Sequence, residues 1–63
     1  MAHWEAIARF TDGTEIRFNK PYTADGNYET ECEQQYAIEC RLLEKAVDTG
    51  KDVEFYSVDF VED

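Results

Sequence analysis

Apolar and polar residues alternate along the first third of the chain with the period of two that is typical of β-strands. Over residues 2–10, one face carries Trp4, Ala6, Ala8 and Phe10. A second alternating segment, residues 14–19, follows the dipeptide Asp12-Gly13, which is a strong hairpin signal. These segments predict two antiparallel strands joined by a short loop.

The length of that loop decides whether the apolar residues of the two strands lie on the same face. A two-residue loop pairs Phe10 with Glu15, which places apolar and charged side chains together. A three-residue loop, Thr11-Asp12-Gly13, pairs Ala8 with Ile16 and brings all the apolar residues to one side. We therefore predict a type I turn followed by a left-handed residue at Gly13, forming a G1 bulge.

Residues 29–48 show helical periodicity after a connecting segment at residues 20–26. Asn27 and Thr30 are both suitable N-cap residues, and Gly50 is a natural residue to follow the C-cap. The apolar stripe predicted to face the core consists of Cys32, Tyr36, Cys40, Leu43 and Val47, with Leu42 and Ala46 flanking it.

Residues 51–61 again have the composition of a strand, but their inward face is ambiguous. The even positions give the more continuous apolar set, and we predict that they point inward: Tyr56, Val58 and Phe60. A bulge near Tyr56-Ser57 is the alternative, and it would bring together Val53, Phe55, Val58 and Phe60.

The predicted element order is therefore strand, strand, helix, strand. A right-handed crossover places the third strand beside the first, which gives a three-stranded antiparallel sheet of order 2-1-3. The helix covers one face of this sheet. The fold class is α+β, and residues 1–63 form a single small domain.

A chain of 63 residues with 43% hydrophobic and 14% aromatic residues has enough apolar surface to fold. A domain of this size is only marginally stable, so we expect a marginally stable monomer or a dimer. The sequence contains neither an apolar run that could span a membrane nor a signal-peptide pattern, so we expect a cytoplasmic protein that does not bind membranes.

The two cysteines, Cys32 and Cys40, are eight residues apart in the predicted helix. Their Cα atoms would lie about 12 Å apart, whereas a disulfide needs less than about 7 Å. Since both fall on the predicted core stripe, we expect two reduced and buried thiols.

Candidate catalytic and metal-binding residues are few. His3 is the only histidine, and the sequence places no orienting partner beside it. Asp25, Asn27 and Glu29 alternate like the start of a calcium loop. Thr30 and Tyr36, however, occupy the positions where that loop needs glycine and glutamate. We therefore expect no enzymatic activity, no cofactor and no metal.

Charge asymmetry is the strongest functional signal. The chain has 15 acidic and 6 basic residues; residues 1–26 hold 4 and 3 of these, a net charge of −1, and residues 27–63 hold 11 and 3, a net charge of −8. With so few bases, direct binding of nucleic acid is disfavoured. The candidate partner-binding residues lie in the helix and the last strand: Glu33, Glu44, Asp48, Asp52, Glu54 and Asp59.

This pattern predicts a non-enzymatic interaction module whose acidic helix and last strand face a basic protein partner. Three alternatives are open. The acidic residues could serve solubility alone, or they could imitate nucleic acid and inhibit a DNA- or RNA-binding protein. In the third alternative, the uncovered sheet face supports a structural role through weak homodimerisation.

Overall fold

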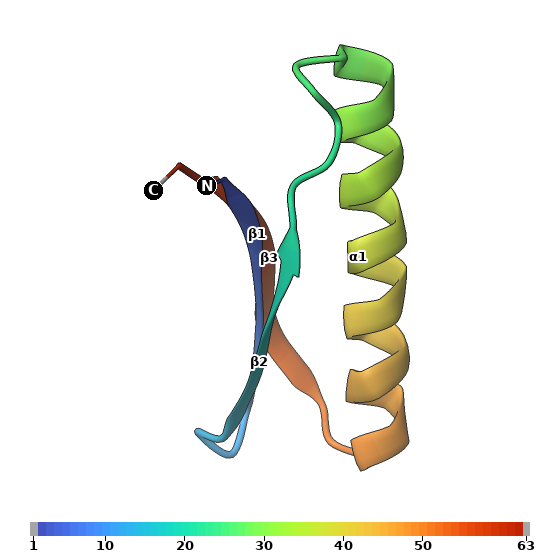
Figure 1. Cartoon of the computed structure of the whole chain (residues 1–63). Helices are drawn as coiled ribbons and strands as arrows, with labels where there is room; N and C mark the ends of the chain where they lie inside the picture. The colour runs from blue at the N-terminus through green and yellow to red at the C-terminus, as the bar shows by residue number, and fades with distance from the viewer. Residues whose placement is uncertain (1, 63) are drawn as a thin grey trace.

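The computed structural model describes residues 2–62 and has two layers, a sheet and one helix (Figure 1). The elements are β1 (His3–Phe10), β2 (Glu15–Pro21), α1 (Tyr28–Thr49) and β3 (Val53–Val61). The sheet order is β2-β1-β3, and both neighbouring pairs are antiparallel. The α+β fold and strand order predicted from the sequence are therefore confirmed, and the helix extends one residue beyond the predicted range at each end.

The β1–β2 hairpin has the predicted three-residue loop. Ala8 pairs with Ile16 and Ala6 with Phe18, so the apolar side chains of both strands share one face. The amide of Phe10 donates to the carbonyl of Thr14 at 2.8 Å, and Gly13 has φ +89°. A positive φ at this point is what the G1 bulge requires, which explains the glycine.

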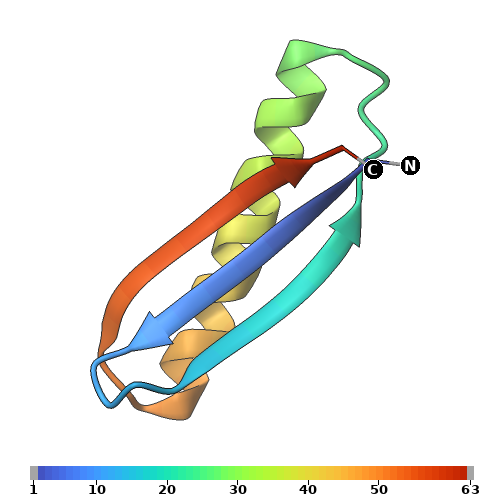
Figure 2. The same ribbon diagram turned by 90° about the vertical axis from the view of Figure 1, so that its left-hand side faces the viewer.

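The core lies between α1 and the face of the sheet that carries Trp4, Ala6, Ala8 and Phe10. Ala6 and Ala8 are small, so the helix can approach the central strand closely. Leu42 is completely buried above them, and Ile38 and Val58 complete the cluster. In the described part of the chain, α1 covers one face of the sheet and the opposite face is left open (Figure 2).

Hydrogen bonds fix both ends of the helix, and most of them lie at its N-terminus. The Asn27 side chain accepts from the amide of Thr30 at 3.0 Å, which makes Asn27 the N-cap. The hydroxyl of Tyr22 donates to the Glu31 carboxylate at 2.6 Å and accepts from the amide of Gly26 at 2.9 Å. At the other end, Gly50 has φ +72° and its amide donates to the carbonyl of Val47.

The strand β3 contains a bulge, but it lies at Glu54 and not near Tyr56-Ser57, the alternative position considered above. Arg9 pairs with Phe55 and Phe10 with Val53, so Glu54 is the extra residue. From residue 56 onward the even positions share the helix side with Trp4, as predicted. Val58 is buried, but Tyr56 and Phe60 remain about half exposed.

Candidate functional site

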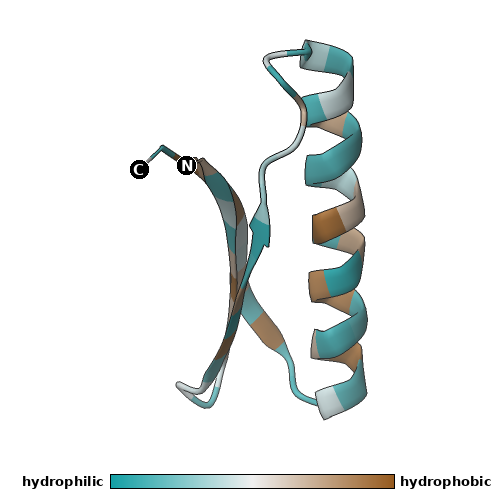
Figure 3. Ribbon diagram, viewed as in Figure 1, coloured by the Kyte–Doolittle hydropathy of each residue, from teal (hydrophilic) through white to brown (hydrophobic). Residues whose placement is uncertain are grey.

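The helix α1 has two apolar faces, and the sequence-based choice between them is wrong. The face against the sheet carries Ile38, Leu42 and Ala46, which are all buried. The stripe predicted to be inside points outward instead, and in it Tyr36 and Val47 are 70% and 77% exposed. Figure 3 shows the most hydrophobic helical segments in the C-terminal half, where both faces contribute.

The physical reason is the indole of Trp4. Its Nε1 donates a hydrogen bond to Oε1 of Gln34 at 3.1 Å, and a buried indole needs such an acceptor. Gln34 is in helical phase with Ile38, Leu42 and Ala46, at steps of four residues. Satisfying Trp4 therefore turns this set of residues toward the sheet.

The cysteines follow the outward stripe, which corrects the expectation of buried thiols. Cys32 is exposed and Cys40 is partly exposed. Side-chain hydrogen bonds with Cys32 and Cys40 raise the pKa of Tyr28 and Tyr36 respectively, each one turn earlier on the helix. Both thiols are free, as predicted.

Carboxylates border the outward stripe over the last turns of α1. Glu44 and Asp48 line a shallow depression together with Cys40, Leu43 and Val47. Exposed apolar side chains that adjoin one another make this part of α1 a candidate interaction surface. We call these five residues the helix patch.

The nearby bases only partly neutralise this region. Arg41 contacts Glu44 at 3.5 Å on the exposed surface, where an ion pair contributes little to stability. Lys45 is directed toward the sheet, with its Nζ 5.3 Å from the centre of the Phe18 ring. The acidic character of the helix patch is therefore largely retained.

The structure divides the six predicted partner-binding residues. Three of them, Glu33, Glu44 and Asp48, are exposed on α1. Asp52 precedes β3, and its backbone carbonyl accepts from the amide of Thr11 at 3.0 Å. Glu54 is at the bulge of β3. The sixth is far from the helix patch, because Asp59 lies on the uncovered sheet face, where it accepts from the Ser57 hydroxyl at 3.2 Å.

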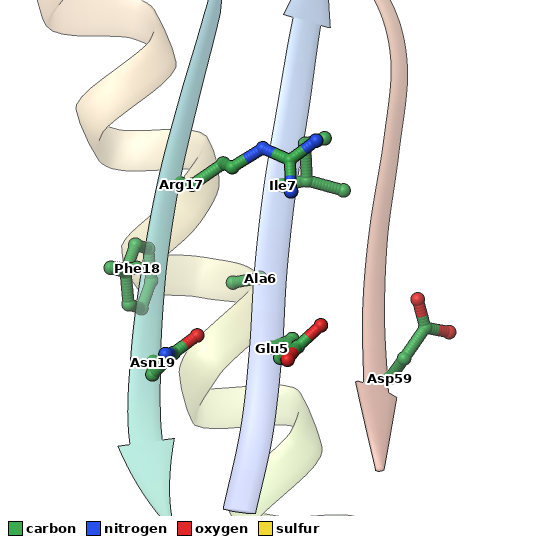
Figure 4. A pocket seen from close by; sticks show the side chains of 7 residues that line it. All are labelled: Glu5, Ala6, Ile7, Arg17, Phe18, Asn19 and Asp59. Atoms are coloured by element: carbon green, nitrogen blue, oxygen red, sulfur yellow. The ribbon is translucent and has the colours of Figure 1, made fainter. Parts of the chain in front are cut away.

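The uncovered sheet face is mixed rather than apolar. Figure 4 shows Ile7 beside Arg17, with Glu5, Asn19 and Asp59 around a shallow depression. Glu15 accepts from Arg17 at 2.8 Å and contacts Arg9 at 3.5 Å. These ion pairs hold the pKa of Glu15 below its usual value, chiefly through the Arg17 hydrogen bond.

The bulge in β3 decides which apolar residues of that strand reach the uncovered face. Val53 pairs with Phe10 and therefore shares the helix side, whereas Phe55 pairs with Arg9 on the uncovered side. Ile7 is opposite Ser57 and Phe55 is opposite Arg9, so neither apolar residue directly faces another across β1 and β3. This arrangement gives the uncovered face less apolar continuity than the helix patch has.

Chemistry-bearing groups are sparse in the part of the chain that the structure describes. Within residues 2–62, groups of three or more His, Cys, Asp or Glu side chains that could hold a metal ion are absent. His3 lies 3.0 Å from the Glu5 carboxylate at the surface. The helix patch, a surface without a deep cavity, is therefore the best candidate site.

The only helix among residues 2–62 is too polar to cross a membrane.

Comparison with known proteins does not assign the site. The chain matches no protein-family model, no curated protein and no solved structure.

Proposed function

We propose that this chain is a non-enzymatic interaction module that binds a basic protein partner through the exposed face of α1. The observation that carries the proposal is the helix patch, in which Leu43 and Val47 lie exposed beside Glu44 and Asp48. Glu33 extends the acidic border toward the N-terminus of the helix.

The two kinds of side chain have separate roles in this proposal. Burial of the apolar strip supplies affinity, since each apolar Å² removed from water contributes about 25 cal/mol. The carboxylates select a partner with Lys or Arg at matching positions and accelerate its approach. Like charge on the chain itself, with a formal net charge of −9, disfavours an acidic partner.

The test is affinity capture at low ionic strength with a charge-matched control. The helix variant carries Glu33→Gln, Glu44→Gln and Asp48→Asn. The control loses the same three charges elsewhere, through Glu5→Gln, Asp25→Asn and Glu62→Gln, all at exposed positions. We expect the wild type and the control to retain one basic protein that the helix variant loses.

Equal loss in both variants would show that only net charge matters, which contradicts the proposal. The same assay addresses the nucleic-acid mimic, because duplex DNA or RNA added in excess would then displace the captured protein. Retention of the basic protein by all three chains would also contradict binding through the acidic helix. It would favour the uncovered sheet face as the interaction surface, including the homodimer suggested there.

A further inference from the structure

The outer edge of β3 lacks the usual protection of an edge strand. Among residues 2–62, β3 pairs only with β1, so no strand lies along its other edge. At Val58, the backbone carbonyl accepts a long hydrogen bond of 3.5 Å from the Gln35 side chain, which a pairing strand would replace. Residues 55–61 contain a single charged residue, Asp59. The opposite edge strand, β2, ends in Lys20 and Pro21, which discourage further strand pairing. Only one edge of the sheet is therefore suited to accept another strand.

Apolar surface is left open along the same side of the molecule. Tyr56 and Phe60 point to the helix side of β3, yet they are 45% and 47% exposed. The helix packs over β1 and β3, and it leaves these two rings about half exposed. Tyr28 and Cys32 line a depression with Phe60 at the border between α1 and β3. Both the sheet and the helix therefore expose apolar side chains along this border.

We propose that two copies of the chain pair through the outer edges of β3, in antiparallel orientation. The product is a continuous six-stranded sheet with both α1 helices on the same face. This interface differs from the uncovered sheet face, and it leaves the acidic residues Glu33, Glu44 and Asp48 accessible in both copies.

The sequence of β3 is self-complementary in this arrangement. A two-fold axis at Ser57, the middle of the strand, places Tyr56 opposite Val58 of the second copy. Asp59 falls opposite Phe55, so acidic side chains do not oppose one another directly. Because the axis is perpendicular to the sheet, the half-exposed rings of both copies remain on the helix side.

The position of α1 fits the same axis. Neighbouring strands are about 4.8 Å apart, so the axis lies about 2.4 Å outside β3. The helix packs on both β1 and β3, so it is about 5–7 Å from the axis, and the two helices lie side by side about 10–14 Å apart. The lower end of this range approaches the spacing of 8–10 Å at which helices pack directly.

The helices would meet near their midpoints. The Gln35 amide donates to the carbonyl of Val58 at 3.5 Å, which places Gln35 one strand residue from the axis. On the flank of α1 near β3, Tyr28 and Cys32 line the border with Phe60. A strand from an unrelated protein would cover the edge of β3 but leave this flank exposed, which favours a second copy.

Electrostatic repulsion between two chains of charge −9 opposes this association. Salt screens that repulsion, so the dimer should become tighter as ionic strength rises. Binding of a basic partner should become weaker under the same change. The two proposals can therefore fail independently.

The first measurement is sedimentation equilibrium of the wild-type chain over a range of protein concentrations at low and high salt. We expect the average mass to rise from 7.4 kDa toward twice that value, and to do so at lower protein concentration in high salt. A monomeric mass under all conditions would overturn the proposal. Binding of a strand from another molecule to the same edge would not restore it, because the proposed occupant is a second copy of the chain.

The second measurement places the axis by disulfide trapping in a background carrying Cys32→Ser and Cys40→Ser. Residues facing each other across antiparallel strands have Cα atoms about 4.5–5.5 Å apart, which is within disulfide range. Ser57→Cys should therefore cross-link to itself under mild oxidation. The control, Asn19→Cys on the outer strand β2, should not, and equal yields from the two variants would contradict the arrangement.

Discussion

Replacing the two neighbouring leucines of α1 one at a time tests which face of the helix supports the fold. Leu42 is fully buried, whereas Leu43 is 36% exposed. Both substitutions, Leu42→Ala and Leu43→Ala, remove the same atoms and make the same change in helix propensity. Any difference between their effects on the free energy of unfolding therefore reports burial.

The expected difference is large for so small a protein. Removing a fully buried leucine costs about 2–5 kcal/mol, because a cavity is left in addition to the lost burial. Partial exposure and the absence of an enclosed cavity reduce the cost of Leu43→Ala to about 1–2 kcal/mol. A domain of this length has a free energy of unfolding of about 3–9 kcal/mol in total. Leu42→Ala should therefore remove a large fraction of the free energy of unfolding.

Urea denaturation, followed by the fluorescence of the buried Trp4, measures both effects. The samples should be dilute and at low salt, so that association does not contribute. We expect the unfolding midpoint to fall far more for Leu42→Ala than for Leu43→Ala. The reverse order would show that the outward stripe is the true core face and would refute the helix orientation on which the candidate site rests.

Three further predictions concern the thiols and the hairpin. Under native conditions, Cys32 should react with a thiol reagent at nearly the rate of an unfolded control and faster than Cys40; slow labelling of both would restore the buried-thiol interpretation. Gly13→Val should lower the free energy of unfolding by about 1 kcal/mol or more, because a β-branched residue resists a positive φ, and an unchanged thermal melt would contradict the G1 loop. The hydrogen bonds and ion pair of Asp12, chiefly with Thr14 and also with Lys51, lower its pKa from 3.8 to about 2, so its contribution to stability is complete above its usual pKa and is lost as pH falls toward 2. The difference in Tm between the wild type and Asp12→Asn should therefore disappear in strong acid, and a difference that grows on acidification would contradict this sign.

The hairpin and the ends of the helix could be predicted from the sequence because local rules determine them, whereas the strand order followed from the handedness of the crossover. A one-residue error in the loop would have sent Ile16 and Phe18 to the wrong face, so only one loop length was compatible with a common core. Asn27 and Gly50 likewise mark the ends of the helix through their own backbone geometry. Each of these features depends on residues close together in the chain.

The orientation of α1 could not be obtained in this way. Two stripes of similar hydrophobicity compete on this helix, and periodicity alone does not rank them. The deciding contact joins Trp4 to Gln34, thirty residues apart. A signal was present in the sequence, since a polar residue in phase with Ile38, Leu42 and Ala46 can accept from a buried indole. The acidic residues Glu44 and Asp48 of the candidate site were predicted, but its apolar strip was missed for the same reason, because that strip was assigned to the core.

The most direct test of the central claim is to map where the captured basic partner contacts the chain. Amide chemical shifts of the isotope-labelled protein, recorded during titration with that partner, report each backbone position separately. The proposal predicts that the largest changes occur at Cys40, Leu43, Glu44, Val47 and Asp48, and that they diminish as salt is added. Changes concentrated on the uncovered sheet face around Ile7 and Arg17, with the helix unaffected, would contradict it.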